Sequence, residues 1–206
     1  MHASRLAFYS AIISFASTVL LTIIGGYYFP DYSHAAQFIS ELGARGAPHE
    51  LQVRFLGFAT SGVFLCIFAA AAWRVLPRST SGSWALGGIV LFALGYVVAV
   101  FFPCDAGCRP QEPSLSQLIH NSAGLAGYLA APAALFFLGR AARDWPDSGR
   151  LSLLVTVCAA VALAGVLTMS PESPLVGVSQ RLIEGGVWLW VLACAVYIRN
   201  SRGATS

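Results

Sequence analysis

Six long apolar segments alternate with short polar ones along the chain. A transmembrane helix needs roughly 20 predominantly apolar residues to cross about 30 Å of hydrocarbon, and each of the six segments approaches that length. The pattern therefore predicts an all-α fold, a polytopic membrane bundle of six transmembrane helices. The segments are 6–29, 55–73, 84–102, 118–139, 151–169 and 180–198.

Composition supports this assignment. The chain of 206 residues is 57% hydrophobic and 10% charged, with a mean hydropathy of +0.70. A soluble domain carries about 25% charged residues. Because the connections between the segments are short, residues 1–206 are expected to form a single six-helix membrane domain with no separate soluble part.

The arginines lie mostly on one side of the predicted bundle, and the chain contains no lysine. Positive side chains are enriched in cytoplasmic connections, so both termini are predicted to be cytoplasmic in a multi-pass protein of the cell inner (plasma) membrane. Anionic cytoplasmic lipid is a sufficient partner for this charge, and no nucleic acid is expected. The inner-side arginines are Arg5, Arg74, Arg78, Arg140, Arg143, Arg150, Arg199 and Arg202.

The longest connection, 31–51, has a pattern typical of an amphipathic helix. His34, Gln37 and Glu41 would share one face of a helix that is capped by Ser33 and ends at Gly43. Two placements are open for this outer connection: a helix resting on the lipid headgroups, or a lid whose polar face looks into the bundle.

Small residues recur at helical spacing within the apolar segments. His120, Gly124, Gly127 and Ala131 follow i, i+4, i+7 and i+11 spacing, which places the histidine above a small-residue face. Such faces allow helices to approach closely in a membrane. They could contact a second copy of the chain or another membrane protein.

Most of the reactive residue types gather between Phe101 and His120. Cys104 and Cys108 fall on the predicted outer side, where cysteines oxidise and persist as disulfides, and three intervening residues allow the required approach. A disulfide is the expected state. Two free thiols, or metal ligation together with Asp105 or His120, are the alternatives.

Three further polar residues are candidates for catalysis or binding. Asp105 could cap a turn or face His120 as a ligand or general base. His120 could accept a carboxylate partner or bond a loop carbonyl. Glu184 enters the last apolar segment, where an ionisable group usually has a partner; Arg181, Arg54 or His120 could supply it.

The segment ends suggest an internal repeat. Each odd segment ends in a proline followed by an acid, and each even segment begins with a glutamine. The unit would be a helical hairpin used three times, related by an axis along the membrane normal. The prolines are Pro30, Pro103 and Pro171, and the glutamines are Gln52, Gln117 and Gln180.

Several short motifs resemble one known family. Ser40-Glu41-Leu42-Gly43 precedes the second segment, Phe102-Pro103-Cys104-Asp105 follows the third, Gly62 lies within the second, and His120 opens the fourth. The chain is thereby similar to the domain-of-unknown-function 998 family of six-span prokaryotic membrane proteins. That resemblance implies no established activity and no catalytic residues, and it does not extend to Cys108.

A more distant similarity is to the seven-span ceramidase and adiponectin-receptor hydrolases, which hold zinc with three histidines. Ser40, Asp105 and His120 would imitate part of such a site. The final segment contains no histidine, so only His34 and His49 could complete a zinc triad. No cofactor is therefore expected, with zinc at His120 and Asp105 as the alternative.

Together these observations predict an outward-facing polar pocket that binds a lipid or other small amphiphile. The alternatives are a lipid hydrolase or transferase that uses Asp105 and His120, with or without zinc to activate water, and an assembly subunit of a membrane complex. The expected ligand-binding residues are Ser40, Glu41, Asp105, His120, Arg181 and Glu184.

Overall fold

The computed structural model describes residues 2–201, and within this range the chain contains helices and no strands. Six helices are long and apolar enough to cross a membrane, so the predicted fold class is confirmed. Arg202 lies outside the described residues. The elements in chain order are α1 (His2–Tyr28), η1 (Ile39–Gly43), α2 (Glu50–Gln52), η2 (Val53–Ala59), α3 (Thr60–Val75), α4 (Thr80–Phe101), η3 (Ala106–Cys108), α5 (Leu115–Ala142), α6 (Gly149–Thr168) and α7 (Val176–Ser201).

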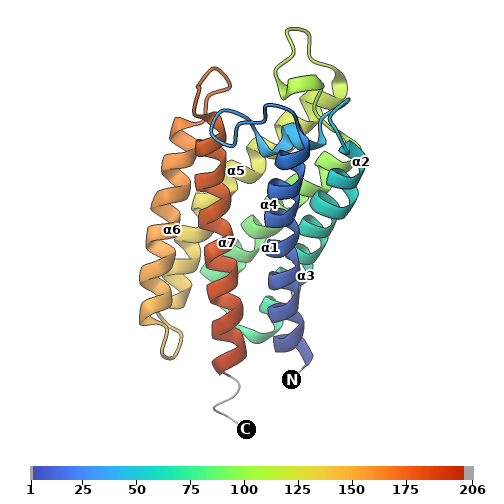
Figure 1. The fold of residues 1–206 in the computed structure, drawn as a ribbon. Helices are drawn as coiled ribbons and strands as arrows, with labels where there is room; N and C mark the ends of the chain where they lie inside the picture. The colour runs from blue at the N-terminus through green and yellow to red at the C-terminus, as the bar shows by residue number, and fades with distance from the viewer. Residues whose placement is uncertain (1, 202–206) are drawn as a thin grey trace.

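The helices run side by side as a bundle (Figure 1). Sequence neighbours pack along their length: α1 against the span formed by α2, η2 and α3, then α4 against α5, and α6 against α7. Both ends of the described chain lie at one end of the bundle, and the connections 31–49 and 102–114 lie at the other (Figure 1). The cytoplasmic placement of the termini and the threefold repeat stay predictions.

Small residues bring the helices of this chain close to one another. A methyl group at Gly62 would lie 2.8 Å from the Ala93 carbonyl oxygen, and one at Gly127 would lie 3.2 Å from the Phe92 Cα atom. Such contacts are typical of membrane helix packing. At these positions the small-residue faces serve internal packing, whereas contacts with another protein stay a prediction.

The second span opens with a π-helical segment, η2 (Val53–Ala59). This wide turn packs Gly57 against Leu21 of α1 and buries Phe58, whose ring centroid lies 5.9 Å from that of Tyr96. Short π-helical turns inside α-helices are frequent at functional sites. The apolar pattern of the sequence did not reveal this one.

The expected helix from Ser33 to Gly43 is wrong. Residues 34–37 form turns, Phe38 is extended (φ −67°, ψ 148°), and only Ile39–Gly43 is helical, as a 3₁₀-helix. Backbone groups of the segment instead bond α7: the Ala35 carbonyl accepts the Val178 N–H at 3.1 Å, and the Ile39 N–H donates to Gln180 Oε1 at 2.5 Å.

Candidate functional site

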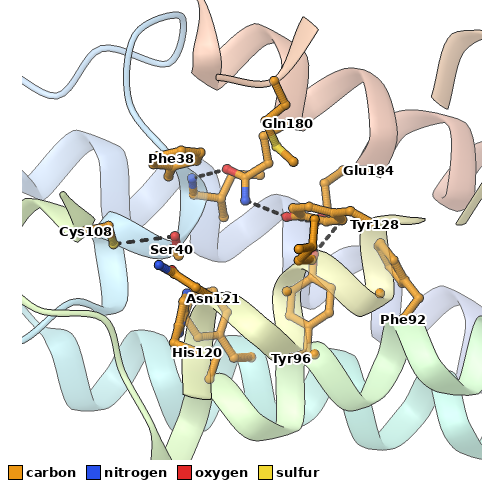
Figure 2. Close-up of a pocket in the computed structure, with 18 of the residues that line it drawn as sticks. Phe38, Ser40, Phe92, Tyr96, Cys108, His120, Asn121, Tyr128, Gln180 and Glu184 are labelled. Atoms are coloured by element: carbon orange, nitrogen blue, oxygen red, sulfur yellow. Dashed lines mark hydrogen bonds between the residues drawn. The ribbon is translucent and has the colours of Figure 1, made fainter. Parts of the chain in front are cut away.

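A cavity of about 330 Å³ lies below η1 and between α4, α5 and α7, toward the end of the bundle opposite the two termini. Figure 2 shows Gln180 and Glu184 reaching in from α7, and His120 and Asn121 from α5. The lining residues are Phe38, Ile39, Ser40, Phe58, Phe92, Gly95, Tyr96, Ala99, Cys108, His120, Asn121, Gly124, Leu125, Gly127, Tyr128, Met169, Pro171, Gln180 and Glu184.

Glu184 is the most deeply placed charged residue of this lining. Only 5% of the surface of this residue is exposed. Oε2 accepts hydrogen bonds from the Tyr96 hydroxyl at 2.6 Å and from Trp188 Nε1 at 3.1 Å, and Oε1 accepts one from the Tyr128 hydroxyl at 3.0 Å. Three donors, one each from α4, α5 and α7, thus converge on one carboxylate. These hydrogen bonds offset part of the cost of burying it.

A chain of hydrogen bonds links Glu184 to the segment 33–43, which ends in η1 and is called the cap of the cavity below. The Ile39 N–H donates to Gln180 Oε1, Gln180 Nε2 donates to the Tyr128 oxygen at 2.5 Å, and the Tyr128 hydroxyl donates to Glu184. Because a backbone N–H can only donate, it fixes the direction of every following bond. The position of η1 and the orientation of Tyr128 are therefore coupled.

Aromatic side chains hold the two tyrosines in place. The ring centroid of Phe92 lies 5.8 Å from that of Tyr96 and 6.0 Å from that of Tyr128. The ring of Phe58 also packs against Tyr96, with the two centroids 5.9 Å apart. These contacts favour a fixed orientation for both hydroxyl groups, and they make much of the cavity wall apolar.

His120 lies on the same cavity, near the start of α5. Its Nδ1 atom is 3.1 Å from the carbonyl oxygen of Phe102, the residue that caps the C-terminus of α4. Among the contacts of the described residues, no hydrogen bond joins His120 to Asp105. The structure brings His120, Ser40 and Glu184 to one cavity, and His120 is occupied by a helix-end carbonyl.

Asp105 is not among the residues that line the cavity in the described part of the chain. Its carboxylate accepts hydrogen bonds from the Ser114 N–H at 2.9 Å and the Ser114 hydroxyl at 2.8 Å, and lies 3.8 Å from Arg45 Nη1. These two bonds from Ser114, followed by the charge of Arg45, lower the pKa of the Asp105 carboxyl. Asp105 thus closes the 102–114 connection onto the start of α5.

Replacing Asp105 with asparagine is expected to lower the thermal unfolding midpoint modestly at neutral pH. The wild-type carboxyl has a lower pKa in the folded protein than its unfolded value of about 3.9. Its stabilisation is therefore present above that unfolded value and is lost as the pH falls through the folded pKa. The difference between Asp105→Asn and wild type, measured across pH in detergent, should shrink toward acid pH.

The matched control is Glu112→Gln, which removes an exposed acid from the same connection. It is expected to leave the midpoint nearly unchanged at every pH. A deficit of Asp105→Asn that stays constant from neutral to strongly acidic pH would contradict the assigned role.

The sulfur atoms of Cys104 and Cys108 lie at bonding distance, with their Cα atoms 5.0 Å apart. This pair is buried beside Ala44, and the Arg45 N–H donates to the Cys104 carbonyl oxygen at 3.0 Å. Cys108 Sγ is 3.5 Å from Ser40 Oγ at the edge of the cavity. The corner after α4 therefore packs directly on the cap.

Glu41 stabilises the cap from inside. This residue is 4% exposed, and its carboxylate accepts bonds from the Phe38 N–H at 3.0 Å, from Gln37 Nε2 at 2.8 Å and from Arg109 Nη2 at 3.4 Å. Arg45, which follows Glu41 at i+4 spacing, faces Asp105 instead of Glu41. Glu41 is not among the described residues that line the cavity.

Arg181 points away from Glu184, so the local ion pair suggested by their i, i+3 spacing is also wrong. Its guanidinium donates to the Gln37 carbonyl oxygen at 3.1 Å and to the Tyr32 hydroxyl at 2.9 Å, and lies 3.0 Å from His34 Nδ1. Burial raises the pKa of Tyr32. Burial, and then the charge of Arg181, lowers the pKa of His34, which favours the neutral ring beside the guanidinium.

Arg54, the other arginine considered for Glu184, pairs instead with Glu50 at 2.6 Å. Within residues 2–201, no three His, Cys, Asp or Glu side chains are grouped so that they could hold a metal ion. The most important site residues that sequence reasoning missed are Tyr96 and Tyr128, the two hydroxyl donors to Glu184.

The six apolar helices define the class: an integral, multi-pass membrane protein. The chain belongs to the family described as protein of unknown function (DUF998), whose sequence profile matches residues 12–197. The family resemblance inferred from the short motifs is thereby confirmed. No curated protein and no solved structure matches the chain significantly.

Proposed function

We propose that this membrane protein binds a lipid or other small amphiphile in the cavity below η1. The observation that carries the proposal is the composition of the wall. Phe58, Phe92 and Leu125 supply apolar surface, while Glu184 and Gln180 supply a hydrogen-bonded polar end. Binding sites of this kind are largely apolar with a few fixed polar groups, and an amphiphile presents the complementary pair of surfaces.

The volume of the cavity limits the ligand. Small-molecule sites span about 300–1,000 Å³, so a cavity of about 330 Å³ lies at the small end. It suits a head group with part of one chain, or a compact single-chain molecule. A complete two-chain phospholipid would have to keep its tails in the surrounding membrane.

The cap supports the same proposal. Ile39 and Ser40 of η1 line the cavity, and the cap is held on one side by Gln180 of α7 and on the other by the corner containing Cys104 and Cys108. If positive-inside topology holds, this end of the bundle faces outward. The ligand would then enter from the outer leaflet or the outer aqueous side.

Filling the cavity tests the proposal. A Cβ atom at Gly124 would meet no heavy atom within 4 Å, although Gly124 lines the cavity. Gly124→Leu should therefore fold normally and occupy ligand space. Overpacking costs about 1–3 kcal/mol, so bound amphiphile, measured by native mass spectrometry after purification in a mild nonionic detergent, should fall roughly tenfold or more.

Gly185→Leu is the matched control. Gly185 is exposed on α7, its Cβ would also meet nothing within 4 Å, and it lies outside the described lining. This variant should retain wild-type adducts. The proposal fails if wild type carries no amphiphile under these conditions or if Gly124→Leu retains as much as Gly185→Leu.

The hydrolase or transferase alternative stays a prediction without a specific observation in its favour. It requires Asp105 and His120 to act together, whereas Asp105 bonds Ser114 and His120 bonds Phe102.

A further inference from the structure

We infer that the ligand of this cavity carries a cationic organic ammonium group, which pairs with Oε1 of Glu184. The inference rests on the proposed function, because it assigns a head group to the amphiphile bound there. Four features of the site carry it: the hydrogen-bond donors that favour ionised Glu184, its remaining acceptor position, the absence of a salt bridge to it within residues 2–201, and the aromatic side chains around it.

The hydrogen bonds require Glu184 to be an acceptor. The Tyr128 hydroxyl has one proton, and its oxygen already accepts from Gln180 Nε2, so that proton is directed to Glu184. On the other carboxylate oxygen, Trp188 Nε1 can only donate. Donors on both oxygens stabilise the ionised form of the carboxyl group over the protonated one.

One acceptor position of Glu184 remains open. A carboxylate offers about four lone-pair sites on two oxygens. Oε2 accepts from both Tyr96 and Trp188, whereas Oε1 accepts from Tyr128 alone. Since Glu184 lines the cavity, a ligand donor can approach Oε1 from the cavity side.

Within residues 2–201, no arginine or histidine side chain forms a salt bridge with Glu184. The ion pairs within residues 2–201 join Arg45 to Asp105, Arg54 to Glu50 and Arg109 to Glu41, all at the outer connections. The nearest arginine in sequence, Arg181, is engaged with the segment 32–37. A buried charge is costly unless it is paired, so a ligand cation would supply what neutral donors cannot.

Aromatic rings surround the same position. Tyr96, Tyr128, Phe92 and Phe58 all line the cavity around the polar end. The faces of aromatic rings attract cations, and ammonium groups are the ligands that aromatic enclosures recognise. An anionic head group would instead be repelled by the Glu184 carboxylate.

Two sources could provide this chemistry: a membrane lipid with an amine-bearing head group, or a soluble amine with an apolar part. The test uses three amphiphiles with the same ten-carbon chain, namely decylammonium, decanol and decyl sulfate, and adds ethanolamine as an amine without a tail. The full-length protein is studied in a maltoside detergent, whose uncharged head group does not compete.

Binding is measured by native mass spectrometry as the difference between wild type and Gly124→Leu, which removes partition into the micelle. Wild type should bind decylammonium roughly tenfold or more tightly than decanol, and decyl sulfate more weakly than decanol. Glu184→Gln keeps the side-chain shape and removes the charge, so it should bind decylammonium and decanol equally.

The outcomes separate the two levels of the proposal. If decanol binds as tightly as decylammonium in wild type, or if the preference survives in Glu184→Gln, the cation inference is overturned while amphiphile binding stands. If no ten-carbon compound binds the wild-type cavity, the proposed function itself fails. Because the first comparison needs only wild type and its Gly124→Leu reference, it remains decisive even if Glu184→Gln does not fold.

Ethanolamine distinguishes the sources. Binding much weaker than that of decylammonium supports an amphiphile as the natural ligand. Binding as tight as that of decylammonium, with the same dependence on Glu184, would uphold the cation site and overturn the lipid source.

Discussion

Replacing Gly177 with alanine is expected to detach the segment 34–37 from α7 and to lower the free energy of unfolding by about 1–3 kcal/mol. An added Cβ atom would lie 2.5 Å from the Gln37 carbonyl oxygen, 2.6 Å from that of His34 and 2.8 Å from that of Ala35. These are backbone atoms, which cannot rotate away as a side chain can. The segment must therefore move as a whole.

The movement would break bonds that seat the cap. The Val178 N–H bond to the Ala35 carbonyl and the Arg181 bond to the Gln37 carbonyl depend on the same close approach. Hydrogen exchange of a peptide covering residues 33–41 should accelerate in Gly177→Ala. Denaturant unfolding in detergent measures the loss of stability.

Gly185→Ala provides the control on the same helix, since its Cβ would meet nothing within 4 Å. Alanine is a better helix former than glycine by about 1 kcal/mol, so this variant should be neutral or slightly stabilised. Equal stability and equal exchange in the two variants would show that the segment does not depend on its contact with Gly177.

The bundle could be predicted from the sequence because the membrane leaves few alternatives. Backbone groups in hydrocarbon must be satisfied internally, so long apolar segments form helices. Local rules also account for two helix ends. Pro103 cannot continue α4, which ends at Phe101. Ser114 caps α5, because its Oγ accepts the Gln117 N–H.

The cap could not be predicted in this way. The spacing of His34, Gln37 and Glu41 fits a helix, but a helix of this length is marginal by itself. Bonds to α7, about 140 positions away in sequence, satisfy the backbone of Ala35 and Ile39 instead. Local pattern and tertiary contact disagreed, and the tertiary contact determined the structure.

The candidate site was predictable only in part. The cost of an ionisable group in a membrane singled out Glu184 correctly as a buried residue, but helical spacing could not show that Arg181 turns outward. Tyr96 and Tyr128 were missed because tyrosines are common in membrane helices. One signal was present: both lie inside apolar segments rather than at the ends, where aromatic belts occur.

The glutamines link the sequence pattern to the chemistry of the site. Gln117 and Gln180 each accept a backbone N–H from a connection at the end of the bundle opposite the termini, that of Asp105 at 2.7 Å and that of Ile39 at 2.5 Å. Gln52, the third glutamine of the suggested repeat, is exposed. Two of the three positions therefore have a shared role in fixing the connections at this end of the bundle, whether or not the hairpins are related as repeats.

Replacing Gln180 with leucine is accordingly expected to lower the free energy of unfolding by about 1–3 kcal/mol. Leucine has a similar size, but it leaves the buried Ile39 N–H without its acceptor and removes the donor that orients Tyr128. Denaturant unfolding measures the loss of stability. The exchange rate of the Ile39 amide, resolved by NMR, shows directly whether its hydrogen bond has been lost.

Gln52→Leu is the matched control, because it makes the same chemical change at an exposed helix start. Exposed substitutions usually change stability by less than about 0.5 kcal/mol, so this variant should resemble wild type. If Gln180→Leu unfolds like Gln52→Leu and leaves the Ile39 amide protected, then η1 is held by other contacts. The chain of bonds from the cap to Glu184 would then not be what fixes the shape of the cavity.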